Sequence, residues 1–178
     1  MQDIERQARK KGIKLERHGR CQFCGSNVQG GVFECFEVFI EMGGRLAETG
    51  LPPFRYADAH CLQHSEVHGD WNNNLHLARQ YLILERGIAW DYSKTPLLSR
   101  IMDDYKLSHP ESRIPALPVM DRGQLTVIDL IGLEHQELER GLGSWANDVY
   151  RSYERFHPIA KAIGDLYLSK YERESKEG

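Results

Sequence analysis

The sequence lacks long apolar runs. No segment approaches the roughly 20 apolar residues that a membrane-spanning helix requires, and the first twenty residues contain no apolar stretch typical of a signal-peptide core. A large excess of charge of one sign is also lacking, because the sequence has 23 Lys and Arg residues and 26 Asp and Glu residues. We therefore expect a cytoplasmic protein that does not bind a membrane and has no general electrostatic attraction for nucleic acid.

Signals of β structure are absent as well. The sequence has no extended alternation of apolar and polar residues, no Asn-Gly hairpin turn and no internal repeat. Its 178 residues are enough for one domain with an adequate core. The fold prediction is all-α: a single helical domain over 21–171, preceded by a charged helix or arm over 1–20 and followed by a charged tail over 172–178.

Apolar residues recur every three or four positions along most of the chain, which is typical of helices packed on a core. The N-terminal helix is the exception, since its few apolar residues predict a solvated helix. The stretch over 107–124 contains three of the seven prolines and is predicted to be a loop. We expect the other helices at 32–50, 54–68, 72–87, 93–106, 126–129 and 135–156, and a last helix that ends at about residue 171.

Cysteine is scarce, with four residues in the chain. In a reducing compartment, such cysteines bind metals or act in redox chemistry more often than they form disulfides. Cys21-Gln-Phe-Cys24-Gly25 has the shape of a zinc knuckle, in which two thiolates in a tight turn reach one ion. The main alternative is a redox dithiol, which lacks its usual strand-then-helix context here. Cys35, taken alone, is typical of a small buried apolar residue.

A second group of ligand-type side chains comprises His60, Cys61, His64 and His68, all within nine positions. On a helix, His60 and His64 are neighbours one turn apart, and so are His64 and His68, so that either pair can chelate a metal. Gly69 follows directly and predicts that the helix ends near His68. His68 is therefore expected to be an exposed residue at the helix end.

Known enzyme motifs fit poorly. The segment HSEVH matches neither HExxH nor HxxEH, because Glu66 lies two residues from each histidine. His64 and Glu66 form the H-x-E of zinc deaminases, but the Cys-x-x-Cys that should follow lies upstream. A ββα-metal nuclease would have ligand types in this order, from the knuckle through Asp58 and His60 to the asparagines at 72–74, yet strand signals are missing.

Several short motifs together resemble one family, an uncharacterised bacterial family recorded as a domain of unknown function. Its members carry a CPxCG start, a central D-A-x-x-x-Q-H and a helix with H-L-x-x-L-x-x-x-L-E-R-G. The similarity covers roughly residues 20–160. The matching elements are Cys21-x-x-Cys24-Gly25, Cys35, Asp58-Ala59, Gln63-His64, His76-Leu77 and Leu84-Glu85-Arg86-Gly87, followed by Gly123–Asp129, Trp145-Ala146, Tyr150 and Tyr153.

The resemblance implies a bound metal but no established activity. The positions of His60 and Cys61 accept other residues in the family pattern, which makes both weaker candidates, although either remains a possible replacement ligand. Here the family's CPxCG proline is absent, and Ser65 stands where a proline usually follows His64. The ligand types that match the family are Cys21, Cys24, Cys35, His64 and His76.

Tetrahedral zinc takes four ligands. Our first choice is a closed structural Zn site formed by Cys21, Cys24, Cys35 and His64, which would attach the N-terminal loop to two helices. In the second choice His76 replaces Cys35 or lies beside the site. Equally, His76 is a buried histidine that bonds a carbonyl or Asp58.

Two classes of function follow. The first is a zinc-stabilised helical module that binds a protein or small-molecule partner. The second is a metal-dependent hydrolase, including a divergent ββα-metal nuclease, whose ion keeps one position open for water and uses Asp58 or Glu66 as a base.

Overall fold

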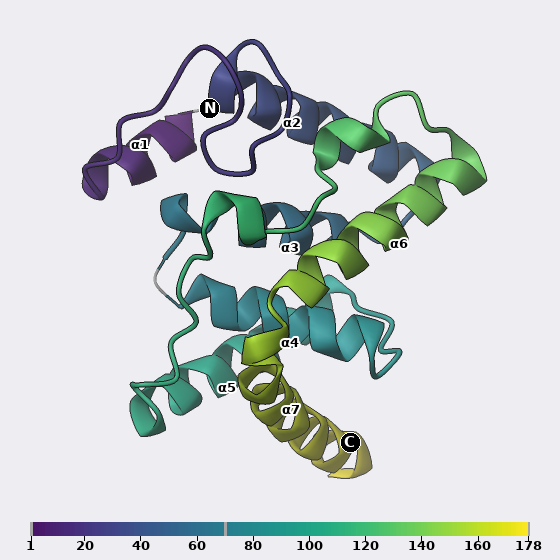
Figure 1. Cartoon of the computed structure of the whole chain (residues 1–178). Coiled ribbons are helices and arrows are strands. Elements are labelled where there is room, and N and C mark those ends of the chain that lie inside the picture. The colour runs from purple at the N-terminus through teal and green to yellow at the C-terminus, as the bar shows by residue number, and fades with distance from the viewer. Residues whose placement is uncertain (1, 70, 178) are drawn as a thin grey trace.

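The computed structural model describes residues 2–69 and 71–177 (Figure 1). Over these ranges the protein has seven α-helices and no β-strand, which confirms the all-α prediction. An isolated bridge between Gly19 and Gly30 closes the N-terminal loop. The helices are α1 (Gln2–Lys10), α2 (Gly31–Thr49), α3 (Phe54–Gln63), α4 (Asn72–Leu84), α5 (Thr95–Ser108), α6 (His135–Ser152) and α7 (His157–Glu177).

Helices α3 and α4 form the centre of the fold. Helix α4 packs against α3 on one side and α7 on another, and α6 crosses α3 (Figure 1). Leu77, Ala78 and Leu82 of α4 are completely buried, as expected for a helix that is apolar on most sides. On α6, Trp145 and Val149 are equally buried. No helix in the described parts of the chain has the length and apolar character to cross a membrane.

Local sequence signals determine several helix ends. Gly50 ends α2 with φ 70°, a left-handed conformation that favours glycine. Pro96 lies in the first turn of α5, where a missing backbone N–H costs nothing. The predicted short helix forms as a 3₁₀ turn over Val127–Leu130, and the side chains of Thr126 and Asp129 make the expected capping box.

The N-terminal and C-terminal helices differ from the predictions. Helix α1 forms but is not solvated on all sides, since Ile4 and Ala8 are only 6% and 1% exposed. Its contact with the 3₁₀ turn Ser65–Val67 provides the burial. Helix α7 continues to Glu177, so the expected boundary at residue 171 falls inside a helix. The reason is local, because no glycine or proline interrupts the sequence YERESKE.

The histidine-bearing helix also ends earlier than predicted. Helix α3 stops at Gln63, and His64 is its C-terminal cap with φ −115° and ψ 34°. The 3₁₀ turn Ser65–Val67 follows, and His68 has extended backbone and a partly buried side chain. The prediction of a helix to His68 was therefore wrong, because the chain leaves the helix where the His64 side chain turns into the interior.

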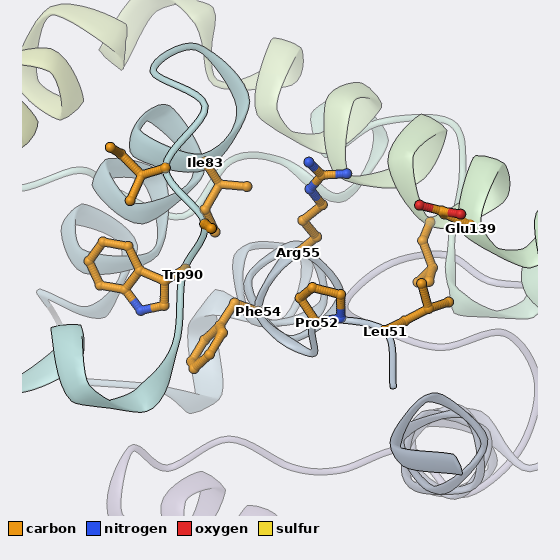
Figure 2. Close-up of a pocket in the computed structure, with 10 residues that line it drawn as sticks. Leu51, Pro52, Phe54, Arg55, Ile83, Trp90 and Glu139 are labelled. Carbon is orange, nitrogen blue, oxygen red and sulfur yellow. The ribbon is translucent and has the colours of Figure 1, made fainter. Parts of the chain in front are cut away.

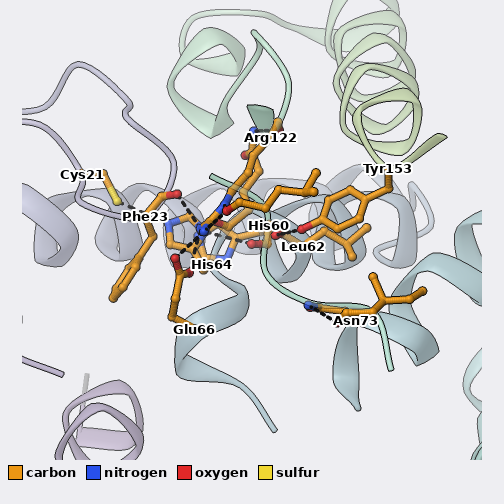
Figure 3. Close-up of polar contacts among 12 residues, drawn as sticks. Cys21, Phe23, His60, Leu62, His64, Glu66, Asn73, Arg122 and Tyr153 are labelled. Atoms are coloured by element: carbon orange, nitrogen blue, oxygen red, sulfur yellow. Dashed lines mark hydrogen bonds and ion pairs between the residues drawn. The ribbon is translucent and has the colours of Figure 1, made fainter. Parts of the chain in front are cut away.

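Arg122 joins three segments that are far apart in the sequence (Figure 3). Arg122 is only 2% exposed to solvent. The guanidinium donates hydrogen bonds of 2.8 Å to the carbonyl oxygens of Leu117, Phe23 and Gln63, and one of 2.7 Å to the Glu66 carboxylate. The buried Arg122 guanidinium thus joins the proline-rich loop to the N-terminal loop and to the end of α3.

Gln63 completes this connection from the other side. Its amide nitrogen donates to the carbonyl oxygens of Arg122 and Leu125 at 3.0 and 2.7 Å, and its amide oxygen accepts from Trp145 Nε1 at 3.1 Å. Every polar atom of this side chain therefore has a partner, as burial requires.

We predict that Arg122→Ala lowers the free energy of unfolding by about 3–5 kcal/mol, because it leaves buried carbonyl groups and the Glu66 carboxylate without their partner. Urea unfolding monitored by circular dichroism measures the change. Arg140→Ala, which removes an exposed arginine from α6, is the matched control and should change stability by less than about 0.5 kcal/mol. Equal effects of the two substitutions would contradict the role assigned to Arg122.

Candidate metal centre

The four residues that the sequence analysis placed first lie together in the structure. One ligand atom from each of Cys21, Cys24, Cys35 and His64 lies within 4.8 Å of all the others, and all four residues are buried. Cys24 Sγ is 3.7 Å from Cys35 Sγ. His64 Nε2 is 3.4 Å from Cys21 Sγ and 3.5 Å from Cys35 Sγ.

These separations correspond to the edges of a tetrahedron around a metal ion. With metal–sulfur bonds of about 2.3 Å and metal–nitrogen bonds of about 2.0–2.1 Å, tetrahedral geometry separates two sulfurs by about 3.8 Å and a sulfur from a nitrogen by about 3.6 Å. The three distances in the cluster are each within a few tenths of an ångström of these values. The four side chains can therefore hold an ion with little rearrangement.

The two knuckle cysteines are positioned by a tight turn. Gly25 N donates to Cys21 O at 2.8 Å, and Cys21 N donates to Ser26 O at 3.1 Å. Gly25 has φ 71°, a conformation in which a side chain would be strained. This explains why a glycine follows the second cysteine of the Cys-x-x-Cys-Gly motif. Both sulfurs then point toward the start of α2, where Cys35 is completely buried.

His64 is oriented by its own helix. Its Nδ1 lies 2.8 Å from the carbonyl oxygen of His60, which leaves Nε2 to face the sulfurs. Metal-binding histidines usually donate their other ring N–H to a carbonyl or carboxylate in this way. Phe23 and Phe36 contact the His64 ring edge-on, with centroids 5.9 and 5.2 Å away, and exclude water from this side.

His60 lies beside the cluster and outside it. Its ring stacks between Phe39 and His64, with centroid distances of 3.8 Å to each. Burial is the largest influence on its pKa, which lies well below the ordinary value, so the ring is neutral. His60 is thus a core aromatic residue that supports His64 from behind.

The electrostatics of the cluster favour a cation. Hydrogen bonds from Cys21 and Cys35 lower the pKa of the Cys24 thiol far below its ordinary range. Hydrogen bonding to Cys21 and Cys24, burial and repulsion by the neighbouring sulfurs raise the pKa of Cys35. Burial lowers the pKa of His64, but the adjacent thiols outweigh it and raise the value to about 10. Three thiols can lose their protons together only if a positive ion replaces them.

His76 is not part of this cluster. Its Nδ1 lies 2.7 Å from Asp58 Oδ1, the bonding partner that the sequence analysis left as one alternative. Asp58 is completely buried and also accepts from Arg79, whose Nε lies 2.8 Å from Oδ2. The ion pair satisfies the carboxylate, and the Arg79 guanidinium packs over the Phe54 ring.

The two carboxylates considered as hydrolytic bases are both occupied. Asp58 is held by Arg79 and His76, and Glu66 forms an ion pair with the buried Arg122 (Figure 3). Neither belongs to the cluster of ligand atoms. The ββα-metal nuclease hypothesis is wrong, because the described ranges contain helices and no strand to build that motif.

The fold and the site together define an all-α protein with a buried Cys3His cluster. The chain belongs to a family of unknown function (DUF5946), whose match covers residues 19–154 and thus all four cluster residues. This confirms the resemblance that the motifs indicated. Comparison with curated proteins and with solved structures finds no match for the chain.

Sequence reasoning missed the role of Arg122, which supports the cluster through Phe23 O and Gln63 O. Phe23 lies between the two knuckle cysteines, and Gln63 directly precedes His64. A single arginine in a proline-rich loop carries no local signal of burial, since most such residues are solvated. The Gly123-Gln-Leu motif that follows it was the nearest available indication.

We predict that Asp58→Asn lowers the free energy of unfolding by about 3–5 kcal/mol, because it leaves the buried Arg79 without a counter-charge. Differential scanning calorimetry should show a midpoint lower by roughly 6–20 °C. Asp91→Asn is the matched control, because its ion pair with Lys94 is exposed and Asn still caps the helix that follows. A wild-type midpoint for Asp58→Asn would contradict the assignment.

Proposed function

We propose that Cys21, Cys24, Cys35 and His64 bind one Zn²⁺ ion in a closed structural site, and that the protein is a zinc-stabilised helical module that binds a partner. The observation that carries the proposal is the set of four buried ligand atoms within 4.8 Å of one another. Thiolate and imidazole ligands in this number and spacing are typical of structural zinc.

A structural role fits the position of the cluster. The site connects the N-terminal loop, the first turns of α2 and the end of α3. Apparent zinc-binding energies of about 10–16 kcal/mol rival the whole stability of a domain, which is about 5–15 kcal/mol. One ion is therefore sufficient to keep an irregular loop attached to the helices.

A closed site also argues against the hydrolase alternative. Four protein ligands leave no coordination position for the water that a hydrolytic zinc ion activates. The candidate bases are engaged elsewhere, Asp58 with Arg79 and Glu66 with Arg122. The ligand set therefore favours a structural ion over a catalytic one.

A pocket of about 170 Å³ supports a binding role (Figure 2). It lies between the start of α3, the segment after α4 and the first half of α6, with Phe54, Ile83 and Trp90 among its apolar walls. The exposed Arg55 and Glu139 add one charge of each sign at its edge. This volume is smaller than that of most ligand pockets and suits a single side chain of a partner or a small ring.

We predict that the cobalt-substituted protein shows sulfur-to-metal charge transfer that decreases by about a third in Cys35→Ser, because one of three thiolate ligands is lost. Cys61→Ser is the matched control, since this cysteine lies outside the cluster, and its spectrum should equal that of the wild type. Absorption spectroscopy measures the band. Full intensity in Cys35→Ser, or a loss in Cys61→Ser, would overturn the ligand assignment.

Removal of the metal should destabilise the protein. We expect one zinc per chain by atomic emission, and a chelator that extracts it should lower the free energy of unfolding by several kcal/mol, because the buried thiols lose their counter-charge. Urea unfolding before and after chelation, followed by zinc re-addition, measures this. A chelated protein with unchanged stability would contradict a structural role, and zinc-dependent hydrolysis that is lost in Cys35→Ser would favour the enzyme alternative.

A further inference from the structure

The pocket of about 170 Å³ beside the start of α3 has walls that the surrounding fold holds in place. The Phe54 ring lies under the Arg79 guanidinium, which is 4.9 Å from its centroid, and edge-on to Trp90, with ring centroids 6.5 Å apart. Trp90 also packs on Tyr167 of α7 and donates from Nε1 to Thr95 Oγ1 at 3.4 Å. A pocket whose walls are already fixed loses little conformational entropy when a ligand enters.

One side of this pocket is apolar. Figure 2 shows Phe54, Ile83 and Trp90 gathered there. These three side chains are 6–7% exposed, so a guest in the pocket can cover apolar surface that folding leaves in contact with water. The volume is enough for one phenyl ring or one branched aliphatic side chain and is well below that of a pocket for a large cofactor.

The other side of the pocket carries two opposite charges. Figure 2 shows the charged ends of Arg55, from α3, and Glu139, from α6, on the side away from Trp90. Both side chains are exposed. In the parts of the chain that the structure describes, neither forms an ion pair or a side-chain hydrogen bond, with the other or with any third residue. A guanidinium and a carboxylate therefore remain available beside one small apolar pocket.

This combination selects among ligand classes by charge complementarity. A residue inside a peptide offers an apolar side chain, but its backbone carries no charge for Arg55 or Glu139. A simple carboxylic acid matches the arginine alone, and a simple amine matches the glutamate alone. A free α-amino acid carries a carboxylate, an ammonium group and an apolar side chain on one carbon atom, so it matches all three parts of the site.

We propose that this pocket binds a free α-amino acid with a large apolar side chain. The side chain enters between Phe54, Ile83 and Trp90, the Arg55 guanidinium donates to the carboxylate, and the Glu139 carboxylate accepts from the ammonium group. The inference rests on the proposed function, because it names the partner that the helical module binds. Helix α3 carries Arg55 in its first turn and ends at the metal-ligand candidate His64, so the zinc ion fixes the helix on which this site is built.

The test is an NMR titration of the zinc-loaded full chain, which detects weak binding through the indole N–H signal of Trp90. We expect L-phenylalanine to shift this signal to saturation at one site. Two analogues each lack one charge, 3-phenylpropanoate the ammonium group and 2-phenylethylamine the carboxylate. Each should bind about two- to fivefold more weakly, the effect of one exposed ion pair. N-acetyl-L-phenylalanine amide, which lacks both charges and imitates a residue inside a peptide, should bind more weakly still.

Two substitutions assign the charges to their partners. Arg55→Gln should abolish the preference for L-phenylalanine over 2-phenylethylamine and keep the preference over 3-phenylpropanoate, because only the carboxylate loses its partner. Glu139→Gln should do the reverse. Both residues are exposed, so neither substitution is expected to affect folding. Arg140→Gln, which changes the exposed neighbour of Glu139 outside the pocket, is the matched control and should keep both preferences.

Three outcomes would overturn the inference. The first is the absence of a saturable shift of the Trp90 signal with L-phenylalanine. The second is equal or tighter binding of N-acetyl-L-phenylalanine amide, which would assign the pocket to a residue of a protein partner. The third is unchanged preferences in both Arg55→Gln and Glu139→Gln. Zinc content measured in the same samples separates these outcomes from a failure of the proposed function, since one zinc per chain would remain in each case.

Discussion

The meeting of three thiols and one imidazole within 4.8 Å constrains three segments at once. Buried thiolates repel one another unless a cation lies between them, so the N-terminal loop, α2 and α3 can keep this arrangement only if the charge is balanced. The tight turn at Gly25 and the early end of α3 at Gln63 both serve this geometry.

The end of α3 connects the cluster to the rest of the protein. His64 faces the thiols, while the adjacent Gln63 faces the proline-rich loop and Trp145 of α6. Arg122 returns from that loop to the carbonyl groups of Phe23 and Gln63, so that two residues next to metal-ligand candidates are held by one buried cation. An apolar loop could not satisfy these carbonyl groups, which explains why a charge is buried here.

Helix α3 thus carries polar side chains on several faces, and each of them contacts a different part of the protein. Asp58 meets Arg79 and His76, His60 stacks behind His64, and Gln63 bonds the loop. Helix periods and caps were predictable because they depend on residues within a few positions, as at Gly50 and Thr126. The end of α3 was not predictable. The His64 side chain bonds the His60 carbonyl oxygen in the last turn of the helix and points toward thiols that are distant in the sequence.

The amino-acid sequence by itself determined the helical class, the knuckle turn and, with the family motifs, the candidate set of Cys21, Cys24, Cys35 and His64. These follow from local periodicity, from the φ that a glycine allows and from the short list of side chains that bind zinc. Only the tertiary structure decided that His76 bonds Asp58 and that Arg122 is buried. Spacing defines which residues share a face of one helix, but the packing of α3 on α4 and the path of a loop decide which faces meet.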